Sequence, residues 1–455
     1  MSSTSGINLS SILAALGSSS SGINVTEAVD SAIAAMSAPM NEWQSEQSAL
    51  ATKTSDLNQI QTDVNALETS LSALQDSSGA LASLTATSSD NAVVNATASA
   101  GAAVGTHVVV VNNIATTASA YSSSVATSTT ALGAGSFTLT VGTGTPTTIT
   151  IGSGVNTLDD VASDINGLNL GVTASIVTDS SGARLSITSN STGSAAGFTL
   201  GNVTGGLTFT QPSTGEDASL TVDGIPIDSA SNTVAGAVNG LTLNLTGADP
   251  GGQVSITVAP DTTTISEAIA TFVGDYNTAM ADVNTQYTVG ATNQEGPLAG
   301  DPTISMLQDA LLSVASYSGG SNGVSTLADL GITMNKDGTL TLDSSTLTSA
   351  IQNNFSAVQT FMQGASSTGF AASLNNQLDT LTTAASGAFT VDLQSISSEN
   401  SDLQDRINNF QAYLNTQQTR LTAEYSQADI ALQELPMELK QISAELGQNT
   451  SSSSS

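Results

Sequence analysis

Residue types that support catalysis are scarce in this sequence and poorly placed for it. The chain has one histidine, His107, and no cysteine. A structural zinc site and a Ser-His-Asp triad both need more of these side chains than the chain contains. His107 opens the run HVVVV, which predicts a buried β-strand. We therefore interpret His107 as a strand residue and not as a catalytic base or a metal ligand.

Three short stretches resemble ligand-binding motifs only in part. In NKDGTLTLD, which begins at Asn335, a calcium loop would place Thr333 and Ser344 at its first and twelfth positions. Both are poor calcium ligands, so a hairpin turn is the better interpretation. GTGTP and GSG lack the Lys-Ser/Thr of a phosphate loop, and Asp159 and Asp160 lie at the solvated start of a predicted helix. We expect no catalytic, cofactor-binding or metal site, and no enzyme.

Two stretches of the chain instead carry apolar residues in alternating steps of three and four, the spacing of the a and d positions of a coiled coil. The N-terminal seam is Leu57, Ile60, Val64, Leu67, Leu71 and Leu74. The C-terminal seam is Leu393, Ile396, Asn400, Leu403, Ile407, Phe410, Leu414, Gln417 and Leu421. An isolated helix of this kind is marginal in water, because its seam must be buried against a partner. We predict that the two seams pair into a helical leg, within one chain or between subunits, with Leu67 and Leu71 facing Leu403, Ile407 and Phe410.

The helices at the two ends have predictable limits. Thr26 is the expected N-cap of a first helix, and a second helix is expected from about residue 41 to residue 84. After Leu421 the apolar spacing takes one extra step of four and continues at Leu432, Leu435, Leu439, Ile442 and Leu446. Pro436 is expected to kink or restart this last helix, because proline removes a backbone donor and clashes with the preceding turn.

Between the ends, from residue 85 onward, the apolar period changes from that of a helix to that of strands joined by Gly-rich turns. The stretch NTLDDVASDINGL predicts one short helix with Asn156 or Thr157 as its N-cap. A hairpin is expected around residues 179–182, and a later helix has Asp301 as its N-cap and Pro302 at its first position. The fold class predicted is a multidomain α+β protein with two nested β-rich head domains between paired terminal helices.

This pattern divides the chain into six parts. They are a flexible N-terminal segment at 1–40, a helical leg domain at 41–84 plus 262–390, a β-rich head domain at 85–130 plus 214–261, an outer head domain with one short helix at 131–213, a C-terminal coiled-coil helix at 391–446, and a disordered tail at 447–455.

The charge balance excludes some classes of partner. The chain carries 38 acidic and 6 basic residues, a formal net charge of −32. Such a field repels phosphate groups, so we expect no nucleic acid partner. No apolar run approaches the ~18 residues of a membrane span, so we expect no membrane insertion. The first basic residue is Lys53, which leaves no charged region for a secretory signal and predicts either a cytoplasmic protein or one exported without a cleaved signal.

Several segments together resemble the bacterial flagellar filament-capping proteins, the hook-associated protein 2 family. They are INVTEAVDSAIAAMSAPM, ASLTVDGIPIDSASNTVAGAVNGLTLNLTG followed by VAPDTTTISEAIATFVGDYN, LADLGITMNKDGTLTLD, and RINNFQAYLNTQQTRLTAEYSQAD. The stretch TITIGSGVNTLDDVASDINGLNLGVTASIVTDSSGARLSITSN is similar to a motif that flagellins and hook-associated proteins share. The resemblance covers nearly the whole chain.

This resemblance implies a structural protein that caps the distal end of the flagellar filament. Family members leave the cell through the flagellar type III route without a cleaved signal and lie at the extracellular tip of the flagellum. They form a ring-shaped homo-oligomer that guides the folding and insertion of exported flagellin and prevents its leakage. The implied partners are other copies of the chain, flagellin, the hook-filament junction protein and an export chaperone. The residues that would carry chaperone or filament contacts are Leu432, Leu435, Leu439, Ile442 and Leu446.

Two alternatives follow from the same sequence. A flagellin-like filament subunit also pairs terminal helices around a β insertion, but its last helix should be apolar nearly to its end, whereas this chain ends in SSSSS. A Ser/Thr-rich surface adhesin would need an export signal or an anchor, and none is visible. Electron microscopy of the purified protein would separate rings, filaments and monomers.

Overall fold

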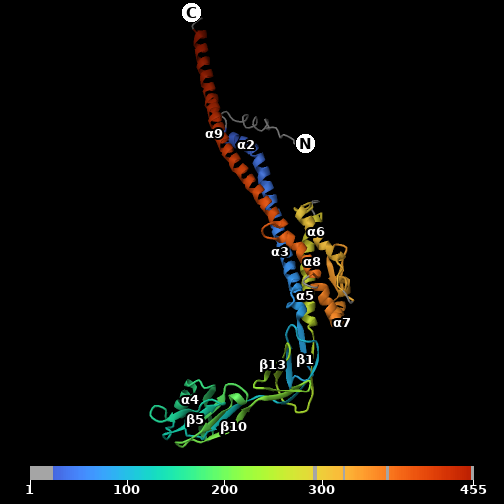
Figure 1. Cartoon of the computed structure of the whole chain (residues 1–455). Coiled ribbons are helices and arrows are strands. Elements are labelled where there is room, and N and C mark those ends of the chain that lie inside the picture. The colour runs from blue at the N-terminus through green and yellow to red at the C-terminus, as the bar shows by residue number, and fades with distance from the viewer. Residues whose placement is uncertain (1–23, 290–294, 321–322, 365–367, 452–455) are drawn as a thin grey trace.

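The computed structural model describes residues 24–289, 295–320, 323–364 and 368–451. The molecule is a long rod that bends at one end (Figure 1). Terminal helices form one end of the rod, a helical domain forms its middle, and two β-rich domains follow, the second turned away from the rod axis. The C-terminal helix extends to the far end of the rod, opposite the β-rich domains.

Three helices belong to the two ends of the chain: α2 (Val25–Met36), α3 (Ala38–Gln75) and α9 (Ala388–Ser451). The N-cap of α2 is Asn24, whose side chain accepts a hydrogen bond from the Glu27 N–H. The prediction of Thr26 was therefore wrong, because a capping side chain three residues before Glu27 was already present in Asn24. α9 is a single helix that runs through Pro436, so it does not restart there, and it takes in residues 447–451 of the predicted tail.

Helix α3 is shorter than the sequence pattern predicted. It ends at Gln75 and not near residue 84. The Asp76 carboxylate accepts hydrogen bonds from the N–H and hydroxyl of Ser78, each at 2.9 Å, and so stabilises a turn that competes with the helix. A short 3-10 helix, η1 (Ala80–Ala82), then leads into the first strand.

The helical domain packs four further helices against α3 and the start of α9. They are α5 (Thr262–Tyr287), α6 (Pro302–Ser313), α7 (Ser344–Gln363) and α8 (Phe370–Thr382). It also contains the 3-10 helices η3 (Val314–Ser316) and η4 (Leu327–Leu330) and the hairpin β16 (Ile332–Met334) and β17 (Leu340–Leu342). The expected N-cap Asp301 accepts from the Thr303 N–H at 2.8 Å. At the centre, the hydroxyl of buried Tyr276 donates to the carbonyl oxygens of Leu311 and Gly338 (3.0 and 3.1 Å), which ties three segments together.

The inner β domain is a sandwich of two antiparallel sheets. The five-stranded sheet has the order β1-β15-β3-β11-β12, and the three-stranded sheet has the order β13-β14-β2. Alternate residues of both sheets fill one core, for example Val109, Leu220 and Leu243. The strands are β1 (Leu84–Ser88), β2 (Val94–Ala98), β3 (Gly105–Asn113), β11 (Ala218–Val222), β12 (Ile225–Ser229), β13 (Thr233–Val238), β14 (Leu241–Leu245) and β15 (Val254–Pro260).

The outer β domain encloses a separate core between two sheets and one helix. Its sheets have the orders β10-β4-β8-β7 and β6-β5-β9. Helix α4 (Leu158–Gly167) begins with a capping box in which Thr157 and Asp160 bond reciprocally, which confirms one of the two predicted caps. The strands are β4 (Thr116–Ser122), β5 (Gly135–Val141), β6 (Thr147–Ile151), β7 (Val172–Asp179), β8 (Gly182–Ser189), β9 (Phe198–Gly201) and β10 (Phe209–Glu216), with η2 (Ser194–Ala196) before β9.

The β domains are nested in the chain. The inner domain is inserted between α3 and α5, and the outer domain is inserted between β3 and β11. Strand β4 pairs with β8 and β10, and its Ala118 and Ala120 belong to the outer core, although residues up to 130 had been assigned to the inner head. Small alanine side chains give a weak strand signal, which is why the pattern placed this strand on the wrong side.

Candidate assembly surfaces

The two ends of the chain lie side by side as antiparallel helices (Figure 1). Trp43 of α3 meets Phe410 of α9 edge to face, with ring centroids 5.4 Å apart. Four residues further along α3, the Gln47 side-chain amide donates to the side-chain oxygen of Gln404 on α9 at 3.3 Å. Aromatic edge contacts of this kind contribute about 0.5–1.5 kcal/mol beyond burial. The leg is therefore made by the two ends of one chain.

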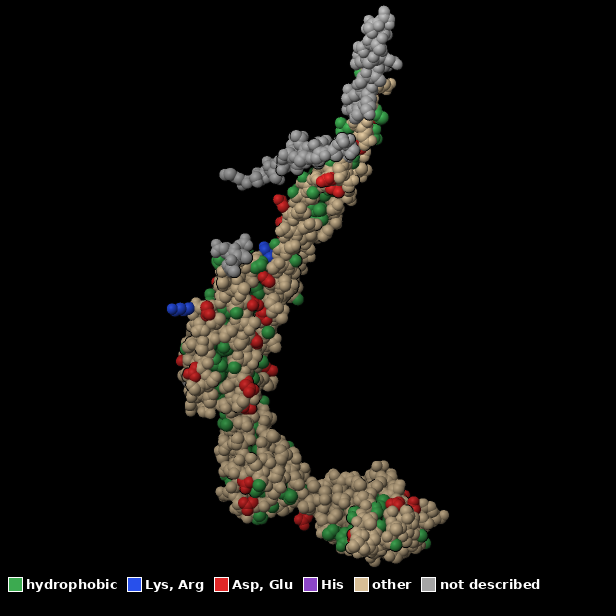
Figure 2. Space-filling model, turned by 180° about the vertical axis from the view of Figure 1, so that it is seen from behind, with side chains coloured by type: hydrophobic (Ala, Val, Ile, Leu, Met, Phe, Trp, Pro, Cys, Tyr) green, Lys and Arg blue, Asp and Glu red, His purple; other side chains and the backbone are tan. Residues whose placement is uncertain are grey.

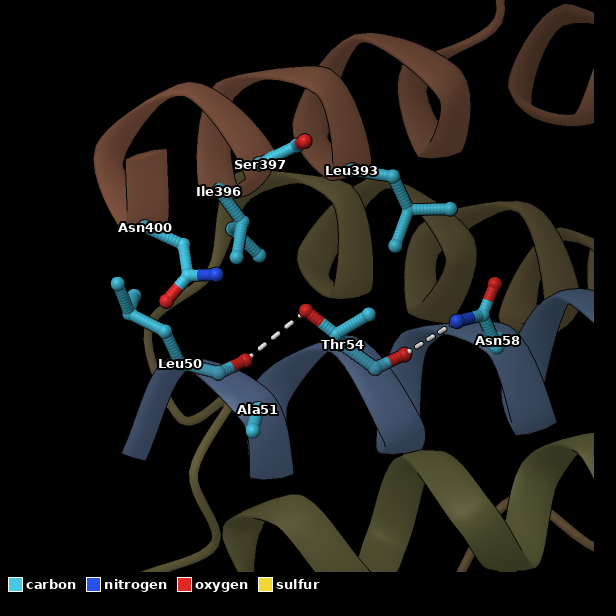
Figure 3. A pocket seen from close by; sticks show the side chains of 8 residues that line it. All are labelled: Leu50, Ala51, Thr54, Asn58, Leu393, Ile396, Ser397 and Asn400. Carbon is cyan, nitrogen blue, oxygen red and sulfur yellow. Dashed lines mark hydrogen bonds between the residues drawn. The ribbon is translucent and has the colours of Figure 1, made fainter. Parts of the chain in front are cut away.

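A pocket of about 320 Å³ separates α3 from α9 below this aromatic contact. Figure 3 shows Leu50, Ala51, Thr54 and Asn58 of α3 on one side and Leu393, Ile396, Ser397 and Asn400 of α9 on the other. The polar side chains on α3 are bonded to their own helix, Thr54 to the Leu50 carbonyl and Asn58 to the Thr54 carbonyl. The two helices thus contact through apolar side chains here but leave a gap between them.

Helix α2 covers the next part of α9. It continues the line of α3 along α9, which it contacts, and its Val29 is buried. On α9, Leu414 is buried and Leu421 is half-buried. This end of the leg is thinner than the middle, since α2 and α9 are the two described helices that form it (Figure 1).

The N-terminal seam has a different partner from the one predicted. All six of its residues are buried in the core of the helical domain with side chains of α5, α7 and α8. At this level of α3 the Thr382 hydroxyl of α8 donates to Glu68 at 2.7 Å. Leu67 and Leu71 therefore lie far along α3 from the layers of Ile407 and Phe410, and the predicted pairing of these layers was wrong. The seam is buried, but the side chains that bury it come from α5, α7 and α8.

The C-terminal seam is only partly used inside the chain. Leu403, Ile407 and Leu414 are buried, whereas Phe410 is half-buried against Trp43. The contact of α3 with α9 through Trp43 and Leu50 was not predicted. These two residues precede Leu57 by heptad steps, so extending the a position backward was the signal for them.

The last part of α9 presents apolar side chains to solvent. Of the proposed chaperone or filament contacts, Leu432 and Ile442 are 44% and 51% exposed. Ile430 and Met437, which were not among the predicted contacts, are similarly exposed. The side chains of Leu435, Leu439 and Leu446 lie outside the described residues. An apolar helix surface that stays exposed in the monomer is typical of a contact site for another protein.

The helical domain has two separate clusters of neighbouring carboxylates, one around Asp282 and one around Asp392. Burial, and then the neighbouring Asp63 and Asp56 of α3, raise the pKa of Asp282 on α5 to about 6. Burial and Asp301 likewise raise the pKa of Asp392 on α9, while Thr303 and Lys53 oppose that rise. Each raised pKa reflects a carboxyl group that is partly buried near another carboxylate of the helical domain.

The single histidine serves the inner β domain. His107 lies in β3, as predicted, and its Nδ1 is 2.8 Å from the Asp223 carboxylate at the β11–β12 turn. The other oxygen of Asp223 accepts from the Val108 N–H at 2.8 Å. These two bonds lower the pKa of Asp223. Their effect is to fix the turn to the neighbouring strand.

Within the described residues, no three His, Cys, Asp or Glu side chains are grouped in a way that could hold a metal ion. Across the same ranges, every helix is too short or too polar for a bilayer span.

Comparison with known proteins gives the family. The family model described as Flagellar hook-associated protein 2 N-terminus matches residues 21–118, the model of the C-terminus of the same family matches 215–436, and a Flagellin hook IN motif matches 136–191. The B-type flagellar hook-associated protein 2 of Pseudomonas aeruginosa is 28% identical over 377 residues, covering 74% of this chain and 79% of that protein. The flagellar hook-associated protein 2 of Aeromonas caviae is 29% identical over 315 residues, 64% of this chain and 67% of the relative.

A solved structure has the same architecture. The D1-D2-D3 domains of the flagellar cap protein FliD from Escherichia coli superpose with a TM-score of 0.58 at 25% identity, covering 75% of this chain and 99% of that one. The nested β domains and the helical domain are thus a known arrangement of structural, non-enzymatic proteins. This chain belongs to the flagellar hook-associated protein 2 family, the proteins that cap the flagellar filament.

Proposed function

We propose that the protein caps the distal end of the filament as a ring-shaped homo-oligomer, with the β domains as a plate and the helical leg directed into the filament. In this role it guides the folding and insertion of exported flagellin and prevents its leakage. The observation that carries the proposal is the separation of two kinds of structure along the molecule. Two β domains with their own hydrophobic cores lie at one end, and a helical leg with exposed apolar side chains lies at the other (Figure 1).

The leg supports this role because part of its apolar surface is exposed to solvent in the monomer. Distal α9 exposes Ile430, Leu432, Met437 and Ile442 along a helix that no other described element covers. An exposed apolar helix face of this length gains free energy when a partner buries it. We propose that flagellin and the hook-filament junction protein meet the leg in the assembled flagellum, and that an export chaperone covers distal α9 before export. In this proposal the protein acts at the extracellular tip of the flagellum.

The six-part division of the chain belongs to the same proposal, with its bounds changed where the structure differs: residues 25–36 and 38–40 are helical, and residues 447–451 belong to α9. The helical domain and α9 form the leg, and the two β domains form the plate. The outer domain begins at β4, because Ala118 and Ala120 lie in its core. Residues 1–23 lie outside the described residues, and the chain is described as helical from Val25 onward.

Complementation of a flagellated host that lacks its own cap protein tests the function. The wild-type protein should restore filaments and keep flagellin out of the medium. Ile442→Asp should leave flagellin in the medium, because it places a carboxylate in the proposed contact surface. Val391→Asp is the matched control, since Val391 lies on the same helix and is 56% exposed compared with 51% for Ile442.

The outcomes separate the parts of the proposal. Failure of the wild type in its native host would contradict capping. Full restoration by Ile442→Asp would contradict the role of distal α9 while leaving capping intact. An adhesin would leave filament growth unchanged in every strain.

A further inference from the structure

The junction between the helical domain and the inner β domain is made by two short connections that lie side by side. Residues 82–84 lead from η1 into β1, and residues 260–262 lead from β15 into α5. The Asp261 N–H donates to the Ser83 carbonyl at 3.0 Å and so joins the two connections. Leu81, just before the first connection, still belongs to the core of the helical domain. Figure 2 shows the molecule narrowing between these two domains.

A pocket of about 290 Å³ lies between the two domains at this junction. Ser78, Gly79 and Ala82 line it from the linker between α3 and β1, and Ala98 and Ala100 line it from the inner β domain. These side chains are small, so the two domains interlock little here. Domains that share only a small interface move relative to each other by default. The two connections alone would therefore leave the inner β domain free to tilt toward the pocket.

Helix α7 supplies two hydrogen bonds that hold the linker before β1. Gln363 Nε2 donates to the Asp76 carbonyl at 2.9 Å, and Gln359 Nε2 donates to the Leu81 carbonyl at 2.7 Å. The two glutamines are four residues apart, so they lie on one face of the helix. The same helix contacts β15, the strand that leads into the second connection. Helix α7 thus meets the chain on both sides of the junction.

The second half of α7 is a rigid support for these contacts. Asn354 has φ −138° and ψ 36°, outside the helical range, so α7 changes direction there. After this kink, four side chains are buried in the core of the helical domain: Ala357, Val358, Phe361 and Met362. Figure 1 shows α7 at the end of the helical domain that faces β1. This half of the helix is therefore anchored in the core and contacts the junction.

We propose that residues 355–363 of α7 act as a brace that fixes the orientation of the inner β domain relative to the helical domain. Gln359 and Gln363 are its positioning residues. Their bonds hold Asp76 and Leu81 in place, and the contact of α7 with β15 supports the second connection. With the brace in place the pocket stays open, because the inner β domain cannot tilt into it. The inference concerns a single copy and does not depend on the proposed capping role.

The distance between two spin labels tests the brace, and the chain has no cysteine of its own to interfere with labelling. Ala66→Cys on α3 and Ala235→Cys on β13 place one exposed label on each domain. Double electron–electron resonance measures the distance in the full-length protein, diluted with unlabelled wild type so that distances between copies do not contribute. This labelled parent should give one narrow distance distribution.

Replacing both glutamines by methionine removes the two donors, because methionine has a similar length but no N–H group. Gln359→Met with Gln363→Met should raise the population of tilted arrangements by about tenfold, the effect of losing two neutral hydrogen bonds, and so broaden the distribution. Gln359→Lys with Gln363→Lys restores a long donor at each position and should narrow the distribution again. Gln352→Met is the matched control, since Gln352 is exposed on the same helix before the kink.

A distribution that stays narrow in the methionine variant would overturn the brace, and so would a parent distribution that is already broad. Broadening that the lysine variant does not reverse, or that Gln352→Met also produces, would overturn the role of the two donors. Circular dichroism at 222 nm checks that the helical domain is folded in each variant. Broadening that comes with a loss of helix would also count against the brace, because unfolding and not tilting would then explain it.

Discussion

Truncation of Leu71 to alanine should destabilise the helical domain by about 3–4 kcal/mol. Leu71 is 0% exposed and lies in the core cluster that joins α3 to α5, α7 and α8. The truncation removes about three methylene equivalents, worth about 0.8 kcal/mol each, or roughly 2.4 kcal/mol of transfer free energy. The rest comes from the cavity, because helices on all sides prevent the site from collapsing.

Urea unfolding followed by circular dichroism at 222 nm measures this change. With a slope of about 2 kcal/mol/M, the midpoint of the helical transition should fall by about 1.5–2 M. The β domains have their own cores, so a sheet signal near 216 nm should keep its midpoint. Leu432→Ala is the control, since Leu432 is 44% exposed and its truncation should change stability by at most about 0.5 kcal/mol.

A loss smaller than about 1 kcal/mol for Leu71→Ala would refute the reasoning, because a leucine in a rigid closed core cannot be removed so cheaply. An equal fall of the helical and β transitions would refute the independence of the cores.

Three further predictions concern other parts of the molecule. A fragment of residues 85–261 should unfold cooperatively with a β-type signal, because both β cores lie within it; a disordered fragment would contradict the nested insertion. Since the pKa of Asp282 is raised to about 6, the folded state keeps a proton that the unfolded chain loses near its ordinary value of 3.8, so stability should fall as pH rises from about 4 to 6. Asp282→Asn should flatten that fall in urea titrations, whereas a profile unchanged by the substitution would refute Asp282 as the group that titrates. Phe410→Ala should shift the emission of Trp43, the only tryptophan, to longer wavelength by exposing its ring, and an unchanged spectrum would contradict the α3–α9 contact.

Sequence patterns predicted the elements well where one local cause decides them. The hairpin of β7 and β8 and the caps Thr157 and Asp301 follow from short-range chemistry. The errors also have local causes. Asn24 competes with Thr26 as a cap, and the Asp76 turn ends α3 early.

Long-range partners could not be read in the same way. The Asp282 and Asp63 carboxylates lie on helices separated by the whole β insertion, and nothing in either helix indicates the other. The contact of the Arg184 guanidinium with the Tyr121 ring was also invisible, because these residues lie on different strands and meet only through the pairing of β4 with β8.

By itself, the sequence determined that both ends are helical, that Leu57 to Leu74 must be buried, and that the β segments are nested between the ends. Only the tertiary structure decided what buries that seam: α5, α7 and α8 cover it, while α9 pairs with α3 nearer Trp43. The physical reason is that a heptad stripe fixes the direction in which a helix must lose contact with water. The hydrophobic effect has no directional code for a partner, so any complementary apolar surface that the chain topology brings close can satisfy it.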